Sequence, residues 1–192
     1  MNDKQKAQYD KMKETINNPE AIMKAKGYSL WLIPTGKAYD KLSGLIQKLA
    51  KDNSAPLFYP HVTLLGGVMQ SEDHVLERTE QLVLGQNPFP ITLNSVDYQD
   101  YYFRTLFVRT EITDPLQALY DRAKEVFGMQ DALDFMPHLS LMYGNFSEAV
   151  KEQIIKDIGR DQTTEFTVNS VQIFKTDGEV NVWHKVKEFP LG

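Results

Sequence analysis

One pattern occurs twice in this chain, and it constrains the fold more than any other feature. Residues 60–63 read Pro-His-Val-Thr and residues 137–140 read Pro-His-Leu-Ser. The two histidines, His61 and His138, stand 77 positions apart (61 to 138), and each motif runs into an apolar stretch that ends in a glycine. Such runs are typical of buried strands. A chain that carries the same strand motif twice is expected to build two similar halves.

The segments around the two motifs follow the same order of predicted elements. Apolar spacing and turn residues predict a first half with a strand at 28–33, a helix at 37–51, the strand with the first motif, a helix at 72–84 and a strand at 90–98. The second half repeats this order with a strand at 103–110, a helix at 115–127, the strand with the second motif, a helix at 147–159, and strands at 165–174 and 180–188. This order predicts two lobes related by a pseudo-two-fold axis, with a site between them.

The N-terminal residues do not belong to this repeat. Residues 3–16 are charged and helix-prone, and a break at 17–19 (Asn-Asn-Pro) follows them. We therefore expect residues 1–26 to form a helical extension and residues 27–192 to form one bilobal domain.

The two motifs bring together the residue types of acid–base chemistry. Residues i and i+2 of a strand point to the same face, so each motif presents an imidazole beside a hydroxyl. Histidine titrates near a pKa of about 6.5, so one ring can accept a proton from water while the other protonates a departing oxygen. The hydroxyls of Thr63 and Ser140 can donate to phosphoryl oxygens. The sequence predicts His61 and His138 as an acid–base pair acting on a phosphodiester.

Either motif alone would be more typical of an ordinary strand, and only the matched pair favours catalysis. The other two histidines stand in different surroundings. His74 opens a polar helix and His184 lies on the last strand, and both are predicted to be exposed. Neither motif has a second His, Asp or Glu at ligand spacing, so no metal ion or other cofactor is expected.

Composition excludes several classes of protein. The chain has no cysteine, which rules out disulfides and thiolate metal sites and suits a reducing, cytoplasmic compartment. A net charge of −5 argues against a surface that tracks long nucleic acid. No signal peptide or apolar run of transmembrane length occurs, so no membrane association is expected. We expect a monomer.

With these residues in view, the chain resembles the 2H phosphoesterase superfamily. More narrowly, it is similar to the cyclic phosphodiesterase branch, whose members process ADP-ribose 1″,2″-cyclic phosphate after tRNA splicing. The likeness spans about residues 28–188. It is carried by 28–31 (Tyr-Ser-Leu-Trp), 58–63 (Phe-Tyr-Pro-His-Val-Thr), 135–143 (Phe-Met-Pro-His-Leu-Ser-Leu-Met-Tyr), 175–177 (Lys-Thr-Asp) and Trp183.

The resemblance implies an α+β fold in which two antiparallel sheets line a central cleft and helices lie outside. It implies metal-independent opening of a small cyclic phosphate: ADP-ribose 1″,2″-cyclic phosphate to ADP-ribose 1″-phosphate, or a nucleoside 2′,3′-cyclic phosphate to the 2′-phosphate. His61 and His138 are then the catalytic pair, and Thr63 and Ser140 hold the phosphate. Tyr143 also binds substrate by resemblance, although alternation along the strand places it opposite His138, as a core aromatic would be.

Other functions and one assignment stay open at the level of sequence. The motifs are nearly symmetric, so only the resemblance favours His138 as the base and His61 as the acid. The N-terminal extension departs from the family pattern and leaves substrate size undecided. The chain could instead cleave 2′–5′ linked or 3′-terminal RNA, although the acidic balance counts against this. A nucleotide-binding module without catalysis is a further alternative, which the intact motifs disfavour. A scaffold role is the weakest, since it needs no matched histidines.

Overall fold

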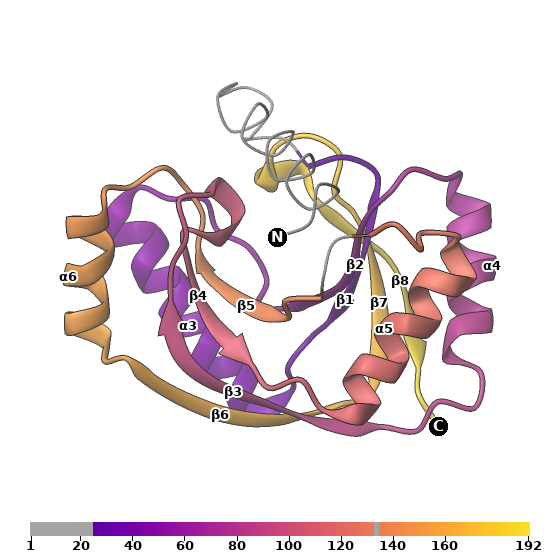
Figure 1. Ribbon diagram of the computed structural model, residues 1–192. Coiled ribbons are helices and arrows are strands. Elements are labelled where there is room, and N and C mark those ends of the chain that lie inside the picture. Colours follow the sequence, from indigo (N-terminus) through magenta and orange to yellow (C-terminus); the bar gives the residue numbers. More distant parts are fainter. Residues whose placement is uncertain (1–24, 133–134) are drawn as a thin grey trace, which may run out of the picture.

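The structure is a computed structural model that describes residues 25–132 and 135–192 (Figure 1). The elements that follow the first repeat are β1 (Tyr28–Leu32), α3 (Gly36–Asn53), β2 (Val62–Val68), α4 (Glu72–Val83) and β3 (Phe89–Asp97). Those of the second are η1 (Tyr102–Arg104), β4 (Leu106–Thr110), α5 (Asp114–Phe127), β5 (His138–Met142), α6 (Glu148–Ile158), β6 (Asp161–Val168), β7 (Ser170–Lys175), η2 (Val180–Val182) and β8 (His184–Pro190). The doubled strand–helix order is confirmed. The helix predicted within residues 3–16 lies outside the described residues.

All the strands join one curled antiparallel sheet in the order β6-β3-β4-β5-β2-β1-β7-β8. The two halves of this sheet meet only between β2 and β5, through the single pair Val62 and Leu139. These are the central residues of the two motifs. The expected α+β fold with helices outside is confirmed (Figure 1), and the two expected sheets form one continuous sheet through this pair.

Some strands and helices of each sequence half pack in the lobe of the other half, and the order of elements does not predict this. β3 follows the first motif in sequence but pairs with β4 and β6, in the lobe of the second motif. β7 and β8 return from the C-terminal end to pair beside β1. The helices cross over as well, because α3 packs against β5 and β6 whereas α5 packs against β2 and α4. In Figure 1, α3 and α6 flank one side and α4 and α5 the other.

Three predicted strands differ from the observed ones. The strand predicted at 165–174 is two strands divided at Asn169, because β6 pairs with β3 at one edge and β7 pairs with β1 in the other lobe. The strand predicted at 103–110 begins only at Leu106, since residues 102–104 form a 3₁₀ turn. The strand predicted at 180–188 likewise begins after η2, at His184.

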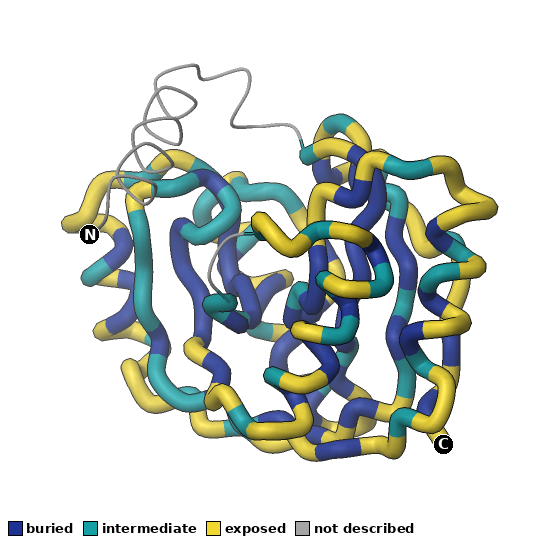
Figure 2. Tube along the Cα trace, turned by 45° about the vertical axis from the view of Figure 1, so that its right-hand side comes forward, coloured by how far each residue is buried: buried dark blue, intermediate teal, exposed yellow. Residues whose placement is uncertain are grey.

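The core forms between the sheet and the inward faces of the helices (Figure 2). In α3 the buried residues Ala38, Leu42, Ile46 and Leu49 recur at helical spacing. In α5 the apolar face ends at Phe127, and Gly128 closes the helix in the left-handed region at φ 66°. Within the described part of the chain, no helix combines the length and apolarity needed to cross a membrane.

Candidate active site

The two motifs meet where the lobes join, and their side chains share one face of the sheet. β2 and β5 are antiparallel and pair through the central residue of each motif. Continuing that register by one residue in each direction sets His61 across from Ser140 and Thr63 across from His138. Residues one step from a pair all point to the same face. The pairing therefore brings the four predicted side chains together around a pseudo-two-fold axis.

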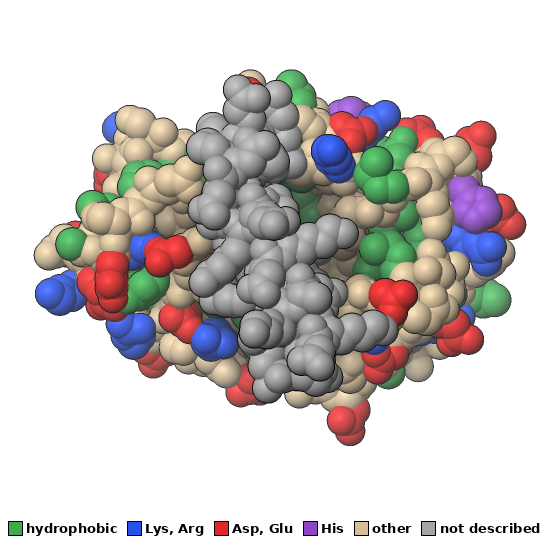
Figure 3. Space-filling model, turned by 45° about the horizontal axis from the view of Figure 1, so that its top comes forward, with side chains coloured by type: hydrophobic (Ala, Val, Ile, Leu, Met, Phe, Trp, Pro, Cys, Tyr) green, Lys and Arg blue, Asp and Glu red, His purple; other side chains and the backbone are tan. Residues whose placement is uncertain are grey.

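These four side chains line one cavity of about 570 Å³. Its walls come from both lobes and from the segment between β3 and β4. Figure 3 shows hydrophobic side chains gathered on one part of this face of the molecule and charges of both signs scattered around its margin. The other lining residues are Ala25, Lys26, Ser29, Trp31, Leu64, Leu65, Gly66, Gly67, Tyr101, Phe103, Arg104, Tyr120, Met129, Asp131, Ala132, Phe135, Met136, Tyr143, Thr176 and Trp183.

The two histidines are held in the same way. His61 Nδ1 lies 2.6 Å from the carbonyl oxygen of Tyr59, and His138 Nδ1 lies 2.9 Å from that of Met136. A carbonyl oxygen only accepts, so Nδ1 of each ring donates its hydrogen. In the neutral ring Nε2 is then the unprotonated nitrogen. Each Pro-His motif thus fixes the same tautomer and leaves Nε2 as the atom that exchanges a proton.

Burial keeps both rings neutral. It lowers the pKa of His61 from about 6.5 to about 3, and the neighbouring His138 lowers it further, while the bond to Tyr59 acts in the opposite sense. Burial likewise lowers the pKa of His138 to about 4, and the positive charge of Arg104 adds to this effect. Near neutral pH both Nε2 atoms of the free protein are therefore proton acceptors.

An aromatic stack supports the first histidine. Trp31 lies between His61 and Phe174, with ring centroids 3.6 Å and 3.9 Å away. Phe107 meets the His138 ring edge-on at 5.1 Å. These contacts account for the desolvation of both imidazoles and restrict their orientation.

Tyr143 lines the cavity despite the alternation that places it on the other face. β5 ends at Met142, so the strand rule no longer governs the next residue. The Tyr143 ring is buried and stacks on Phe58 with centroids 3.9 Å apart. Burial raises the pKa of its hydroxyl. Tyr143 is thus both a packed aromatic and a wall of the cavity.

The two hydroxyls differ in their present bonding. Ser140 is buried and its Oγ donates to the carbonyl oxygen of Phe103 at 3.0 Å. Thr63 is half-buried, and its hydroxyl has no hydrogen bond to another described residue. Only Thr63 therefore has its donor free, whereas Ser140 must exchange one acceptor for another to bind an anion.

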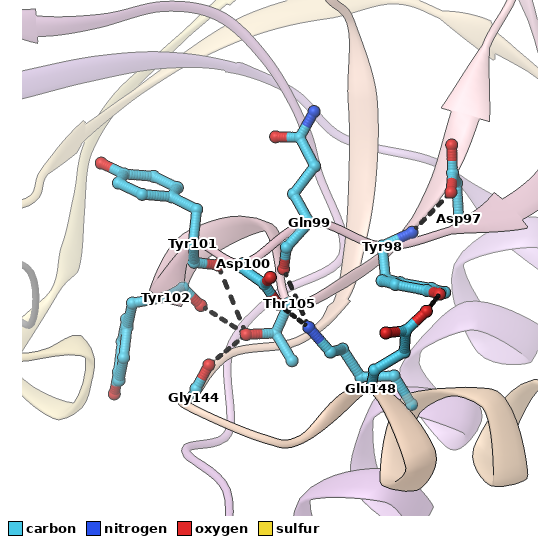
Figure 4. Close-up of polar contacts among 10 residues, drawn as sticks. Asp97, Tyr98, Gln99, Asp100, Tyr101, Tyr102, Thr105, Gly144 and Glu148 are labelled. Atoms are coloured by element: carbon cyan, nitrogen blue, oxygen red, sulfur yellow. Dashed lines mark hydrogen bonds and ion pairs between the residues drawn. The ribbon is translucent and has the colours of Figure 1, made fainter. Parts of the chain in front are cut away.

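The segment between β3 and β4 forms a wall of the cavity, and an ion pair and several hydrogen bonds hold it in place (Figure 4). Lys151, on α6, is buried and bridges to Asp100 at 2.5 Å. Thr105 Oγ1 donates to the carbonyl oxygens of Gly144 and Tyr102, and Tyr98 donates to Glu148 at 2.8 Å. A loop with this many polar anchors is preorganised.

Arg104 is the residue of this loop that the sequence analysis missed. It lies in the cavity wall, it is half-buried, and burial lowers the pKa of its guanidinium. Among the described residues it has no ion-pair partner, and its guanidinium lies 5.8 Å from the centre of the Tyr101 ring. The only sequence signal was an arginine within the aromatic run at 101–104, which has no recognised spacing.

The remaining histidines lie elsewhere, as expected. His74 is exposed on α4, where its Nε2 accepts from Arg78 at 3.2 Å. His184 is exposed at the start of β8. Across residues 25–132 and 135–192, no cluster of three or more His, Cys, Asp or Glu side chains is placed to hold a metal ion.

A curled antiparallel sheet with one His-x-Thr or His-x-Ser motif from each lobe in a shared cavity is the architecture of the 2H phosphoesterases. Solved structures agree on the fold. Protein TT0787 of Thermus thermophilus is 14% identical with a TM-score of 0.61, over 86% of this chain and 97% of that one. LigT of E. coli, crystallised with 3′-AMP, is 16% identical with a TM-score of 0.56, over 88% of this chain and 98% of that one.

The chain belongs to the cyclic phosphodiesterase-like protein family, whose sequence model matches residues 25–191, and it is thereby a phosphodiesterase. It is also 25% identical over 167 residues to the cyclic phosphodiesterase of Arabidopsis thaliana, covering 83% of this chain and 92% of that protein.

Proposed function

We propose that this protein hydrolyses a small cyclic phosphate by a two-histidine acid–base mechanism that needs no metal ion. The observation that carries the proposal is the symmetry of the site. Two imidazoles from opposite lobes lie in one cavity, each with Nδ1 bonded to the carbonyl oxygen two residues before it. Structural histidines have no need of identical tautomers on opposite sides of a cavity.

The reaction adds water across one P–O bond of the cyclic ester. His138 Nε2 accepts a proton from water as the oxygen attacks phosphorus, and His61 donates a proton to the ester oxygen as its bond to phosphorus breaks. Transfer of the proton from His138 to His61 then restores the reactive pair, in which His61 is protonated and His138 is neutral. Both rings are neutral in the free protein, so His61 must first take up a proton. A bound phosphate anion raises the pKa of a nearby imidazole and favours this uptake.

The other groups hold the phosphoryl oxygens, whose negative charge persists throughout the reaction. Thr63 donates directly, and Ser140 donates once a phosphate oxygen replaces the carbonyl of Phe103 as its acceptor. Tyr143, held by its stack on Phe58, forms a wall against which the substrate lies. Arg104 supplies a second positive charge, in addition to that of the protonated His61. Its preorganised loop lowers the reorganisation needed during the reaction.

The substrate we propose is ADP-ribose 1″,2″-cyclic phosphate, a nucleoside 2′,3′-cyclic phosphate, or both. The name of the Arabidopsis relative supports a cyclic ester. On the described part of the face in Figure 3, charges of both signs are mixed and form no basic stripe, which disfavours long RNA. We further propose that the protein acts as a monomer without nucleic-acid or membrane partners.

Product analysis tests this function. The protein is incubated in EDTA with each cyclic phosphate and with a 2′–5′ dinucleotide, and products are identified by chromatography and ³¹P NMR. We expect the cyclic phosphates to open in EDTA and the dinucleotide to stay intact. Loss of turnover that a divalent ion restores would refute the metal-independent mechanism. Binding without turnover would identify a nucleotide-binding module instead.

A further inference from the structure

A second cavity, of about 320 Å³, lies next to the first and shares two of its walls. Trp31 and Trp183 line both cavities. We propose that this second cavity binds the aromatic base of a substrate whose cyclic phosphate occupies the first. The placing of the cyclic phosphate in the first cavity rests on the proposed function, whereas binding of the base in the second cavity does not.

The chemistry of the lining favours a neutral planar ligand. The cavity is built from one side of α3, the segment 57–60 and η2, and none of its lining residues is charged. The first cavity, by contrast, contains Lys26, Arg104 and Asp131 beside the two histidines. The faces of Trp31 are covered by His61 and Phe174, so it contributes only part of the wall. The rings of Tyr39, Tyr59 and Trp183 are those on which a flat ring can stack.

The second cavity also carries hydrogen-bonding groups without partners. The Oγ atom of Ser43 is shielded from solvent and has no hydrogen bond among the described residues. The side-chain amides of Gln47 and Asn181 are exposed at the rim of the cavity and make no hydrogen bond to another described residue, so they are available to a ligand. A buried hydroxyl is normally paired. Nucleobases combine stacking faces with an edge of donors and acceptors, which is the combination that this lining would satisfy.

Exposed apolar side chains lie in and beside the lining of the second cavity. Leu57, Tyr59 and Val182 are 58%, 54% and 56% exposed, and all lie in or beside the lining segments. Clustered apolar exposure marks ligand sites more often than isolated exposed residues do. A base that stacked here would cover them.

The position of the cavity selects between the two proposed substrates. In a nucleoside 2′,3′-cyclic phosphate the base and the cyclic ester share one ribose. In ADP-ribose 1″,2″-cyclic phosphate, a pyrophosphate and a second ribose separate adenine from the cyclic ester. A base site beyond the wall formed by Trp31 and Trp183 suits the longer molecule. The geometry therefore favours a dinucleotide-like cyclic phosphate over a mononucleotide.

Substrate comparison is the first test. We make Gln47→Ala and Asn181→Ala, singly and together, with Gln81→Ala on α4 as a matched control outside both cavities. The double variant is expected to lose about tenfold or more in kcat/KM for ADP-ribose 1″,2″-cyclic phosphate. For adenosine 2′,3′-cyclic phosphate it is expected to stay within about twofold of the wild type. Equal losses on both substrates, or no loss on either, would overturn the substrate preference.

Binding of adenosine is the second test and does not depend on turnover. Adenosine has no phosphate, and both tryptophans of the chain line the two cavities, so intrinsic fluorescence reports binding in either one. Weaker binding to the double variant assigns the signal to the second cavity. We expect adenosine to quench wild-type fluorescence, with and without inorganic phosphate in the first cavity, and to bind at least tenfold more weakly to the double variant. Unchanged affinity in a folded double variant, checked by circular dichroism, would refute the base site. If the protein opened no cyclic phosphate but this binding difference held, the proposed function would fail and the base site would stand.

Discussion

Replacing Arg104 by glutamine removes the half-buried positive charge from the first cavity and should weaken catalysis more than it weakens folding. Its guanidinium has no ion-pair partner among the described residues, so the substitution leaves no carboxylate unpaired. Two unit charges about 4 Å apart attract by about 4 kcal/mol at an effective dielectric constant of about 20. Water reaches this half-buried group and reduces the attraction to about 2–3 kcal/mol. At about 1.4 kcal/mol per factor of ten, kcat/KM should fall by about 10²-fold.

The same variant should move the pH profile. Arg104 lowers the pKa of His138, so its removal raises that pKa. The base must be neutral to accept a proton from water, and kcat/KM rises with pH as His138 loses its proton. The rising limb should therefore shift to higher pH in Arg104→Gln, whereas Arg104→Lys keeps a positive charge and should shift less.

The assay is the initial rate of cyclic-phosphate opening between pH 4 and pH 9, with unfolding in urea as the check on stability. Arg78→Gln is the matched control, because Arg78 is likewise half-buried but lies on α4 outside the cavity. If kcat/KM of Arg104→Gln stayed within twofold of the wild-type value and the rising limb of its pH profile did not shift, a group other than Arg104 would have to balance the phosphate charge.

Three further predictions concern the motifs. His61→Ala and His138→Ala should each lower kcat by about 10²-fold or more, and the double variant should be little worse; a substrate with an activated leaving group should rescue only His61→Ala, and the reverse would exchange acid and base. Thr63→Ala and Ser140→Ala should each cost about 1–3 kcal/mol in kcat/KM, and full activity of the doubly substituted protein would limit them to a structural role. The free energy of unfolding should decrease as pH falls from about 6.5 toward 4, because in that range the histidines of the unfolded chain bind protons and the two imidazoles of the folded protein do not. Urea unfolding at pH 5 and pH 7.5 measures this decrease. A His61→Gln variant with the same pH dependence as the wild type would contradict it.

Local patterns were sufficient to predict most elements, but they did not predict how those elements pair. The helix at 36–53 follows from the spacing of Leu42, Ile46 and Leu49 along the chain, which is a local property. The segment 165–174 was predicted as one strand because both of the strands that it spans are extended. Its division at Asn169 arises because the two parts pair in different lobes. The exchange of helices between the lobes has the same origin, since nothing in a helical pattern states which sheet it covers.

The sequence by itself determined the chemistry of the candidate site. Strand alternation places a histidine and a hydroxyl on one face, and the duplication requires two such faces. The tertiary structure alone decided their environment. It set the pKa values of His61 and His138 through burial beneath rings that are distant in sequence. It brought Tyr143 into the cavity where its strand ends, and it placed Arg104 there through a loop anchored on α6. Burial and charge depend on every neighbour in space, whereas alternation along a strand depends only on the next two residues.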